Sequence, residues 1–346
     1  NVVSNGLVLD KNGQKMSKRL GNAVDPFTTL DKYGPDATRW YMITNAQPWD
    51  NLKFDLEGIT ETQRKFFGTL YNTYSFFGLY ANMDDFDYSA PDLALEQRPE
   101  IDRWVLSKLN SLIKNVDEAY NTYEPTKAGR LIQEFVGDQL SNWYVRLCRR
   151  RYWKQATDEA GINDKLSAYQ TLYTCLEKVA ILASPIAPFF MDQLFLDLNK
   201  VSNKSTLESI HLADFPVVDE SFIDLELEAQ MEIAQKTSSL VLGLRKKERI
   251  RVRQPLQKIM VPVLDEKFAE NINHVKDLIL SEVNVKELEL LAEDNSVLVK
   301  SIKPNFKTIG PKYGKHMKAI AGMVAQFSSD DIAKIESEKG WSGEIN

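Results

Sequence analysis

Apolar side chains in the central part of this 346-residue chain recur at steps of three and four, and this spacing limits its fold more than any other feature. The spacing places them on one face of an α-helix. It predicts five helices, over residues 57–83, 100–123, 126–154, 163–183 and 189–198. Because helices of this length with short connections pack antiparallel to their neighbours, we expect an up-and-down helical bundle.

The segments on either side of the bundle lack this regular spacing. Residues 1–55 predict a strand over 3–10 and two short helices over 26–33 and 35–44. The remaining segment predicts a long helix over 219–247, strands over 258–263, 286–291 and 296–302, helices over 265–281, 313–327 and 329–339, and the start of a strand over 341–346. The expected fold is mainly α: a short α/β segment (1–55), a helical bundle (56–215) and a small α+β domain (216–346).

Cysteine and histidine usage limits the possible chemistry. Only Cys148 and Cys175 are present, without a Cys-x-x-Cys pair, and the three histidines are scattered. We therefore expect a reducing compartment, the cytoplasm, with no disulfide framework and no metal ligands. No apolar run is long enough to span a bilayer and no signal-peptide pattern is present, so we expect no membrane partner.

Positive charge is concentrated in three segments, although the net charge is −6. Residues 139–157, 243–258 and 296–318 contain a single acid between them. Such segments either face a polyanion or pair with acidic segments such as residues 219–232, and the sequence leaves both interpretations open. The candidate nucleic-acid contacts are Arg146, Arg149, Arg150, Arg245, Lys246, Arg249, Lys312 and Lys315.

In the first basic segment, helical phase separates core residues from surface residues. Trp143 and Arg151 fall near one face of the predicted helix, so we expect Trp143 in the core. Arg146, Arg149 and Arg150 fall on other faces, and they are the better candidates for contact with a nucleic acid.

A short basic run lies between two glycines near the start of the chain, over residues 13–22. It contains two lysines, Lys15 and Lys18, with the Ser17 hydroxyl between them and Arg19 directly after. These donors can surround a polyphosphate, and the glycines let the loop bend so that backbone N–H groups approach the anion. The alternative is an exposed lysine-rich loop that binds nothing.

The string Lys-Met-Ser-Lys-Arg, residues 15–19, resembles the Lys-Met-Ser-Lys-Ser signature of the class I aminoacyl-tRNA synthetases, with Arg19 in place of the last serine. The strings at residues 33–41, 101–110, 140–146 and 182–189 are similar to class Ia members of that family. The strings at residues 250–256 and 305–314 most resemble the isoleucyl-tRNA synthetases of the eukaryotic-like branch. The resemblance spans nearly the whole chain.

This resemblance implies an ATP site at the basic loop. Lys18 is expected to contact the ATP phosphates and to stabilise the charge that grows on the departing pyrophosphate. Lys15 and Ser17 are expected to hold the loop and add donors, and Arg19 keeps a positive donor there. ATP with Mg²⁺ is the implied substrate and the isoleucine-acceptor tRNA the implied partner. The resemblance implies that residues 1–55 form a stem-contact segment and that the bundle (56–215) is an anticodon-binding domain, which binds the anticodon stem and loop.

Other parts of such an enzyme are not found in this sequence. The chain has no His-x-Gly-His motif, and the amino-acid pocket and editing domain of the family are missing. We therefore expect a C-terminal fragment of isoleucine-tRNA ligase, inactive alone, whose partners include the N-terminal catalytic and editing domains. Pyrophosphate exchange by the isolated chain would refute the expected inactivity.

Two alternatives remain open at this point. A valyl or leucyl enzyme would differ in the amino acid that the complete parent enzyme attaches to tRNA. A non-catalytic tRNA-binding module would have no upstream sequence encoding a nucleotide-binding fold.

Overall fold

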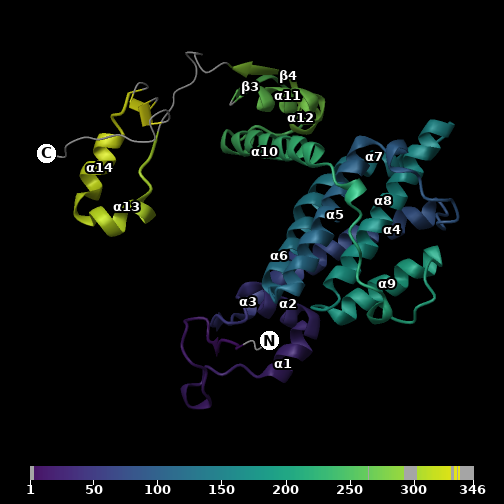
Figure 1. The fold of residues 1–346 in the computed structure, drawn as a ribbon, viewed down its shortest axis with the longest axis horizontal. Coiled ribbons are helices and arrows are strands. Elements are labelled where there is room, and N and C mark those ends of the chain that lie inside the picture. The colour runs from purple at the N-terminus through teal and green to yellow at the C-terminus, as the bar shows by residue number, and fades with distance from the viewer. Residues whose placement is uncertain (1–3, 264, 292–301, 329–330, 333, 336–346) are drawn as a thin grey trace. The chain divides into compact units, whose positions relative to one another are not determined.

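The computed structural model describes residues 4–263, 265–291, 302–328, 331–332 and 334–335 (Figure 1). The chain forms two units, Asn1–Glu232 and Ile233–Asn346, and the division falls inside helix α10 (Leu225–Lys247). The mainly α fold class is confirmed. The domain boundaries expected after residues 55 and 215 remain predictions.

The first unit begins with a small α/β segment. Strand β1 (Val8–Leu9) pairs in parallel with β2 (Leu52–Lys53), so the strand predicted over 3–10 is much shorter than expected. Helix α1 (Pro26–Tyr33) begins where the sequence predicts, because the Asp25 side chain accepts a hydrogen bond from the Thr28 N–H at 2.8 Å and caps it. Helix α2 (Pro35–Asn45) follows.

The predicted bundle is present. Its helices are α3 (Leu56–Thr62), α4 (Gly68–Met83), α5 (Glu100–Asn121), α6 (Pro125–Glu134), α7 (Arg146–Trp153), α8 (Glu159–Ala183) and α9 (Pro188–Ser202). Helix α5 packs against α6 and α8 (Figure 1). Helix α8 begins four residues before the predicted start, because the Asp158 carboxylate caps it by accepting from the Gly161 N–H at 2.9 Å.

Two of the predicted bundle helices contain stretches of π-helix. These are Gln63–Phe67, between α3 and α4, and Phe135–Val145, between α6 and α7. Wider turns shift the helical phase, and consecutive residues Trp143, Tyr144 and Val145 are all buried. The prediction that Trp143 belongs to the core is therefore confirmed.

Helix α10 begins six residues after the predicted start at 219. Asp219 instead caps a separate 3₁₀ turn, Glu220–Phe222, by accepting from the Ser221 N–H at 3.0 Å.

In the second unit, β3 (Leu256–Pro262) and β4 (Val285–Leu291) pair in parallel with Leu256 opposite Val285. Two helices, α11 (Glu266–His274) and α12 (Lys276–Val283), replace the single helix predicted over 265–281.

The last described helices lie earlier than the sequence predicts. Helix α13 (Phe306–Tyr313) starts seven residues before the predicted helix over 313–327, because the Asn305 side chain accepts from the Lys307 N–H at 3.2 Å and caps it. A 3₁₀ turn (Gly314–His316) separates it from α14 (Met317–Val324). The strands predicted over 296–302 and 341–346 and the helix over 329–339 lie wholly or mainly outside the described residues.

Candidate functional site

The basic loop is closed by the residues at its two ends, Asp10 and Asn22. Asp10 Oδ1 accepts hydrogen bonds from the N–H groups of Asn12 (2.9 Å) and Gln14 (2.8 Å), and Oδ2 accepts from Asn22 Nδ2 (2.9 Å). Asn22 Oδ1 accepts from the Ser17 N–H at 2.8 Å. The Gln14 N–H, followed by the Asn22 amide, lowers the pKa of Asp10 below its usual value. Neither residue was predicted to have this role, although short Asp and Asn side chains beside glycines are typical of turns.

Inside the loop, Ser17 caps a short 3₁₀ helix, Lys18–Leu20, by accepting from the Leu20 N–H at 3.2 Å. Gly21 follows at φ 64°, and Gly13 lies at φ 83° on the other side of the basic run. Both angles fall in the left-handed region that glycine adopts without steric cost. The two glycines are therefore required for the backbone path of the loop.

The cations of the loop are available to an anion. Lys15, Lys18 and Arg19 are exposed, and none of their side chains forms a hydrogen bond or ion pair with another residue in the described part of the chain. Lys18 lies close enough to Asp25 to contribute weakly to the lowered pKa of that carboxyl, after the Thr28 hydrogen bonds that dominate. The loop thus combines a closed backbone with three unpaired positive side chains.

Helix α7 presents the first set of predicted nucleic-acid contacts. Arg146, Arg149 and Arg150 are exposed. The Arg146 Nε donates to the Asn142 carbonyl at 2.8 Å, and its guanidinium lies 5.7 Å from the ring centroid of Trp143. These three residues therefore form one arginine surface along α7.

Arg151, the neighbour of these arginines, points into the bundle. Its Nη1 and Nη2 donate to the two oxygens of Asp102 at 2.6 and 2.8 Å, and Asp102 is fully buried. Asp102 also accepts from the Tyr144 hydroxyl at 2.7 Å and from the Ser167 hydroxyl. The network joins α5, α7, α8 and the π-helical stretch, so it fixes the helix that carries the arginine surface. Asp102 was not predicted to have this role, and its one signal in the sequence is that it is an acid within an apolar helix face.

In the second basic segment, Lys246 and Arg249 are exposed but Arg245 is not. Only 2% of the Arg245 surface is accessible, and its guanidinium donates to the carbonyls of Arg251, Gln254 and Asn284. A side chain committed to three backbone carbonyls is not available to a nucleic acid. Arg245 is therefore removed from the predicted contact surface.

In the third segment, Lys312 lies in the last turn of helix α13 and Lys315 lies in the following 3₁₀ turn, and both are exposed. The alternative interpretation paired the basic segments with acids from residues 219–232. Two of these acids bind lysines of α5 instead: Glu228 pairs with Lys108 at 3.2 Å and Glu220 with Lys114 at 2.8 Å.

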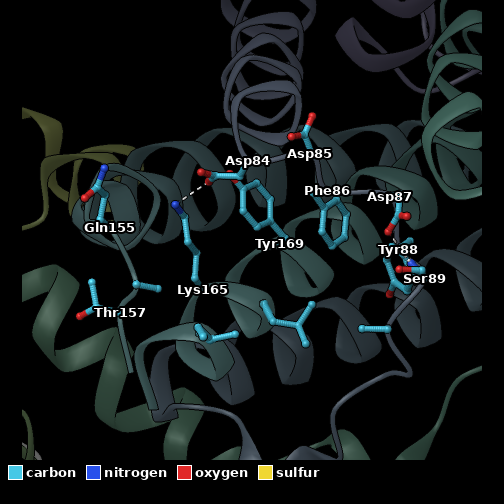
Figure 2. Close-up of a pocket in the computed structure, with 14 residues that line it drawn as sticks. Asp84, Asp85, Phe86, Asp87, Tyr88, Ser89, Gln155, Thr157, Lys165 and Tyr169 are labelled. Atoms are coloured by element: carbon cyan, nitrogen blue, oxygen red, sulfur yellow. Dashed lines mark hydrogen bonds and ion pairs between the residues drawn. The ribbon is translucent and has the colours of Figure 1, made fainter. Parts of the chain in front are cut away.

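A pocket at one end of the bundle has the opposite electrostatic character (Figure 2). Its cavity of about 480 Å³ lies between the segment 84–90, the segment 155–157 and the first turns of α8. Asp84 pairs with Lys165 at 2.5 Å, whereas Asp85 and Asp87 add two exposed carboxylates (Figure 2). Because this wall repels phosphate, the pocket does not belong to a phosphate-binding surface.

Comparison with known proteins identifies the family. A family model described as the anticodon-binding domain of tRNA ligase matches residues 102–260, and one described as tRNA synthetases class I (I, L, M and V) matches residues 1–55. The chain therefore belongs to the class I aminoacyl-tRNA synthetases.

Within that family, isoleucine--tRNA ligases match almost the whole chain, so the predicted resemblance is confirmed. The enzyme of Cytophaga hutchinsonii is 60% identical over 97% of this chain and 30% of its own length. Those of Bacteroides fragilis and Clostridium tetani are 62% and 40% identical over 97% and 96% of this chain and 29% and 31% of their own lengths. The chain thus spans about 30% of the length of these relatives. The eukaryotic-like branch remains a prediction.

A solved structure, the ternary complex of Agrobacterium radiobacter K84 agnB2 LeuRS with tRNA and LeuAMS, is more distant. It is 19% identical over 64% of this chain and 25% of its own, with a TM-score of 0.46. Within the described residues, no helix is long and apolar enough to cross a membrane, and no group of three or more acidic, histidine or cysteine side chains could hold a metal ion.

Proposed function

We propose that this chain supplies the ATP-phosphate loop and the anticodon-binding region of an enzyme that attaches isoleucine to its tRNA. The observation that carries the proposal is the closed basic loop with three unpaired cations, in a chain 60% identical to the isoleucine--tRNA ligase of Cytophaga hutchinsonii. The amino-acid pocket and editing site would belong to the parts of the relatives that this chain does not cover. We propose that this enzyme acts in the cytoplasm and that its nucleotide substrate is ATP with Mg²⁺.

The loop would act on the first step of the reaction. An isoleucine carboxylate oxygen attacks the α-phosphorus of ATP, the bond from that phosphorus to the bridging oxygen breaks, and pyrophosphate leaves with its negative charge. Lys18 would bind this growing charge more strongly in the transition state than in the ground state. Removal of one such donor typically costs about 3–4 kcal/mol of activation free energy.

The test of this role uses the complete enzyme that carries these residues. Lys18→Ala should slow isoleucine-dependent pyrophosphate exchange by about 100- to 1,000-fold. Lys11→Ala is the matched control, since Lys11 is an exposed lysine of the same loop outside the basic run. Equal rates for the two variants would contradict the proposal.

The arginine surface of α7 would bind the tRNA backbone. We expect the affinity of the chain for tRNA to be weak. It should also depend strongly on salt, because each phosphate contact releases counterions. Replacing Arg146, Arg149 and Arg150 together by alanine should flatten the dependence of log affinity on log salt by up to about three contacts.

The control for the triple arginine variant replaces three lysines of the same bundle by alanine and so removes the same number of cations. These lysines, which all pair with neighbouring acids, are Lys127, Lys178 and Lys200. If the arginine variant keeps the wild-type slope, the three arginines have only a structural role.

A further inference from the structure

The turn that follows α10 is organised around the buried side chain of Arg245. Its Nη1 donates to the carbonyls of Arg251 (3.2 Å) and Gln254 (3.0 Å), the two ends of a tight turn closed by the Gln254 N–H to the Arg251 carbonyl at 3.0 Å. Its Nη2 donates to the Asn284 carbonyl at 2.9 Å, next to β4. Asn284 in return donates from Nδ2 to the Val252 carbonyl at 2.9 Å. Three carbonyls of one short turn are thus held by two side chains.

Arg249 connects this turn to the helix in an unfavourable backbone conformation. The Arg249 N–H donates to the Lys246 carbonyl at 3.2 Å and the Ile250 N–H to the Arg245 carbonyl at 2.8 Å, which is the hydrogen-bond pattern that ends many helices. Its φ is 57°, in the left-handed region where glycine is the favoured residue. An arginine at this position is not explained by helix termination alone.

The cations around the turn are exposed and have no acidic partner. Arg249, Arg251 and Arg253 are exposed, and none of them forms an ion pair with another residue in the described part of the unit. The nearby acids of β4 are engaged elsewhere, since Glu287 accepts from Gln257 at 2.6 Å and Glu289 pairs with Lys258 at 2.7 Å. The turn therefore keeps a concentrated positive charge on a fixed backbone.

We propose that Arg249, Arg251 and Arg253 form a preorganised clamp for the phosphate backbone of RNA, and that buried Arg245 is its positioning residue. This inference rests on the proposed function, because the RNA would be the tRNA of that function. Guanidinium groups suit phosphate oxygens, which they can bind through two N–H donors at once. The match to the anticodon-binding family model extends to residue 260 and so includes the turn, which favours RNA over another polyanion.

The experiment measures binding of the chain to an isoleucine-acceptor tRNA transcript by fluorescence anisotropy between 0.05 and 1 M salt. Arg251→Ala/Arg253→Ala should weaken binding about 25- to 60-fold at 0.1 M salt and lower the salt slope by about 1.4–1.8. Lys267→Ala/Lys286→Ala is the control, because it removes two exposed lysines from the same unit. It should leave both quantities close to wild type.

Two more variants separate positioning from simple loss of structure. Arg249→Gly should weaken binding about fivefold or more at 0.1 M salt, while the melting temperature is kept or raised, because glycine suits the left-handed position. Arg245→Lys removes no exposed charge, yet it should weaken binding about fivefold. A lysine ammonium lacks the planar, forked donors with which the guanidinium holds the three carbonyls, so the turn would no longer be fixed.

The outcomes are distinct. If the wild-type chain does not bind tRNA, both the proposed function and the clamp are overturned. If it binds, and the Arg251/Arg253 variant matches the lysine control, the clamp alone is overturned. If Arg251/Arg253 and Arg249 matter but Arg245→Lys binds like wild type, the positioning role is overturned.

Discussion

The ion pair between Arg151 and Asp102 offers a direct test of how the arginine surface of α7 is held in place. Replacing Arg151 by methionine keeps most of its packing volume but removes both N–H donors to the buried Asp102 carboxylate. Only the hydroxyls of Tyr144 and Ser167 then remain as partners. Breaking a buried ion pair from one side typically costs about 3–5 kcal/mol. We therefore expect the free energy of unfolding of the first unit to fall by about that amount.

Urea unfolding followed by tryptophan fluorescence measures this change, because Trp104 and Trp143 are buried in the same unit. The double variant Asp102→Asn/Arg151→Met has no buried charge left over, so it should be more stable than Arg151→Met alone. A loss of unfolding free energy below about 1 kcal/mol for Arg151→Met would refute the reasoning. So would a loss for the double variant that equals the sum of the losses for the two single variants.

Three further predictions concern other parts of the first unit. Gly58→Ala should lower the melting temperature, because its Cβ would lie 2.3 Å from Cε2 of the buried Tyr41; an unchanged melting temperature would count against the packing described. The lowered pKa of Asp10 means that its loop bonds stabilise the fold above the usual value of 3.8 and are lost as pH falls through the folded pKa, so an NMR titration of the Gln14 amide should have its midpoint below 3.8. Burial raises the pKa of Cys148 to about 12 and also raises that of Cys175, so both thiols should resist an aromatic disulfide reagent at pH 8 until urea unfolds the chain; fast labelling of the native protein would contradict this.

Sequence reasoning worked best where the deciding interactions are local. Helix α1 begins and ends at the predicted residues, because the Asp25 cap and the proline at its first position are adjacent in sequence. It failed at the π-helical stretch Phe135–Val145, where burial of three consecutive side chains depends on neighbouring helices. It also missed Asn305 as a cap, so the start of α13 was predicted too late.

The amino-acid sequence alone determined where the bundle helices lie, where positive charge gathers and which family the chain resembles. Helical phase separated Arg151 from Arg146, Arg149 and Arg150, but it did not show that Arg245 is buried. Arg151 and Arg245 each stand among exposed basic neighbours, and no local feature separates Arg245 from Lys246. Their partners lie far along the chain: Asp102 is 49 residues from Arg151, and Asn284 is 39 residues from Arg245. Only the tertiary structure brings these groups together, and it thereby assigns two of the cations to the interior and leaves the others free to meet an anion.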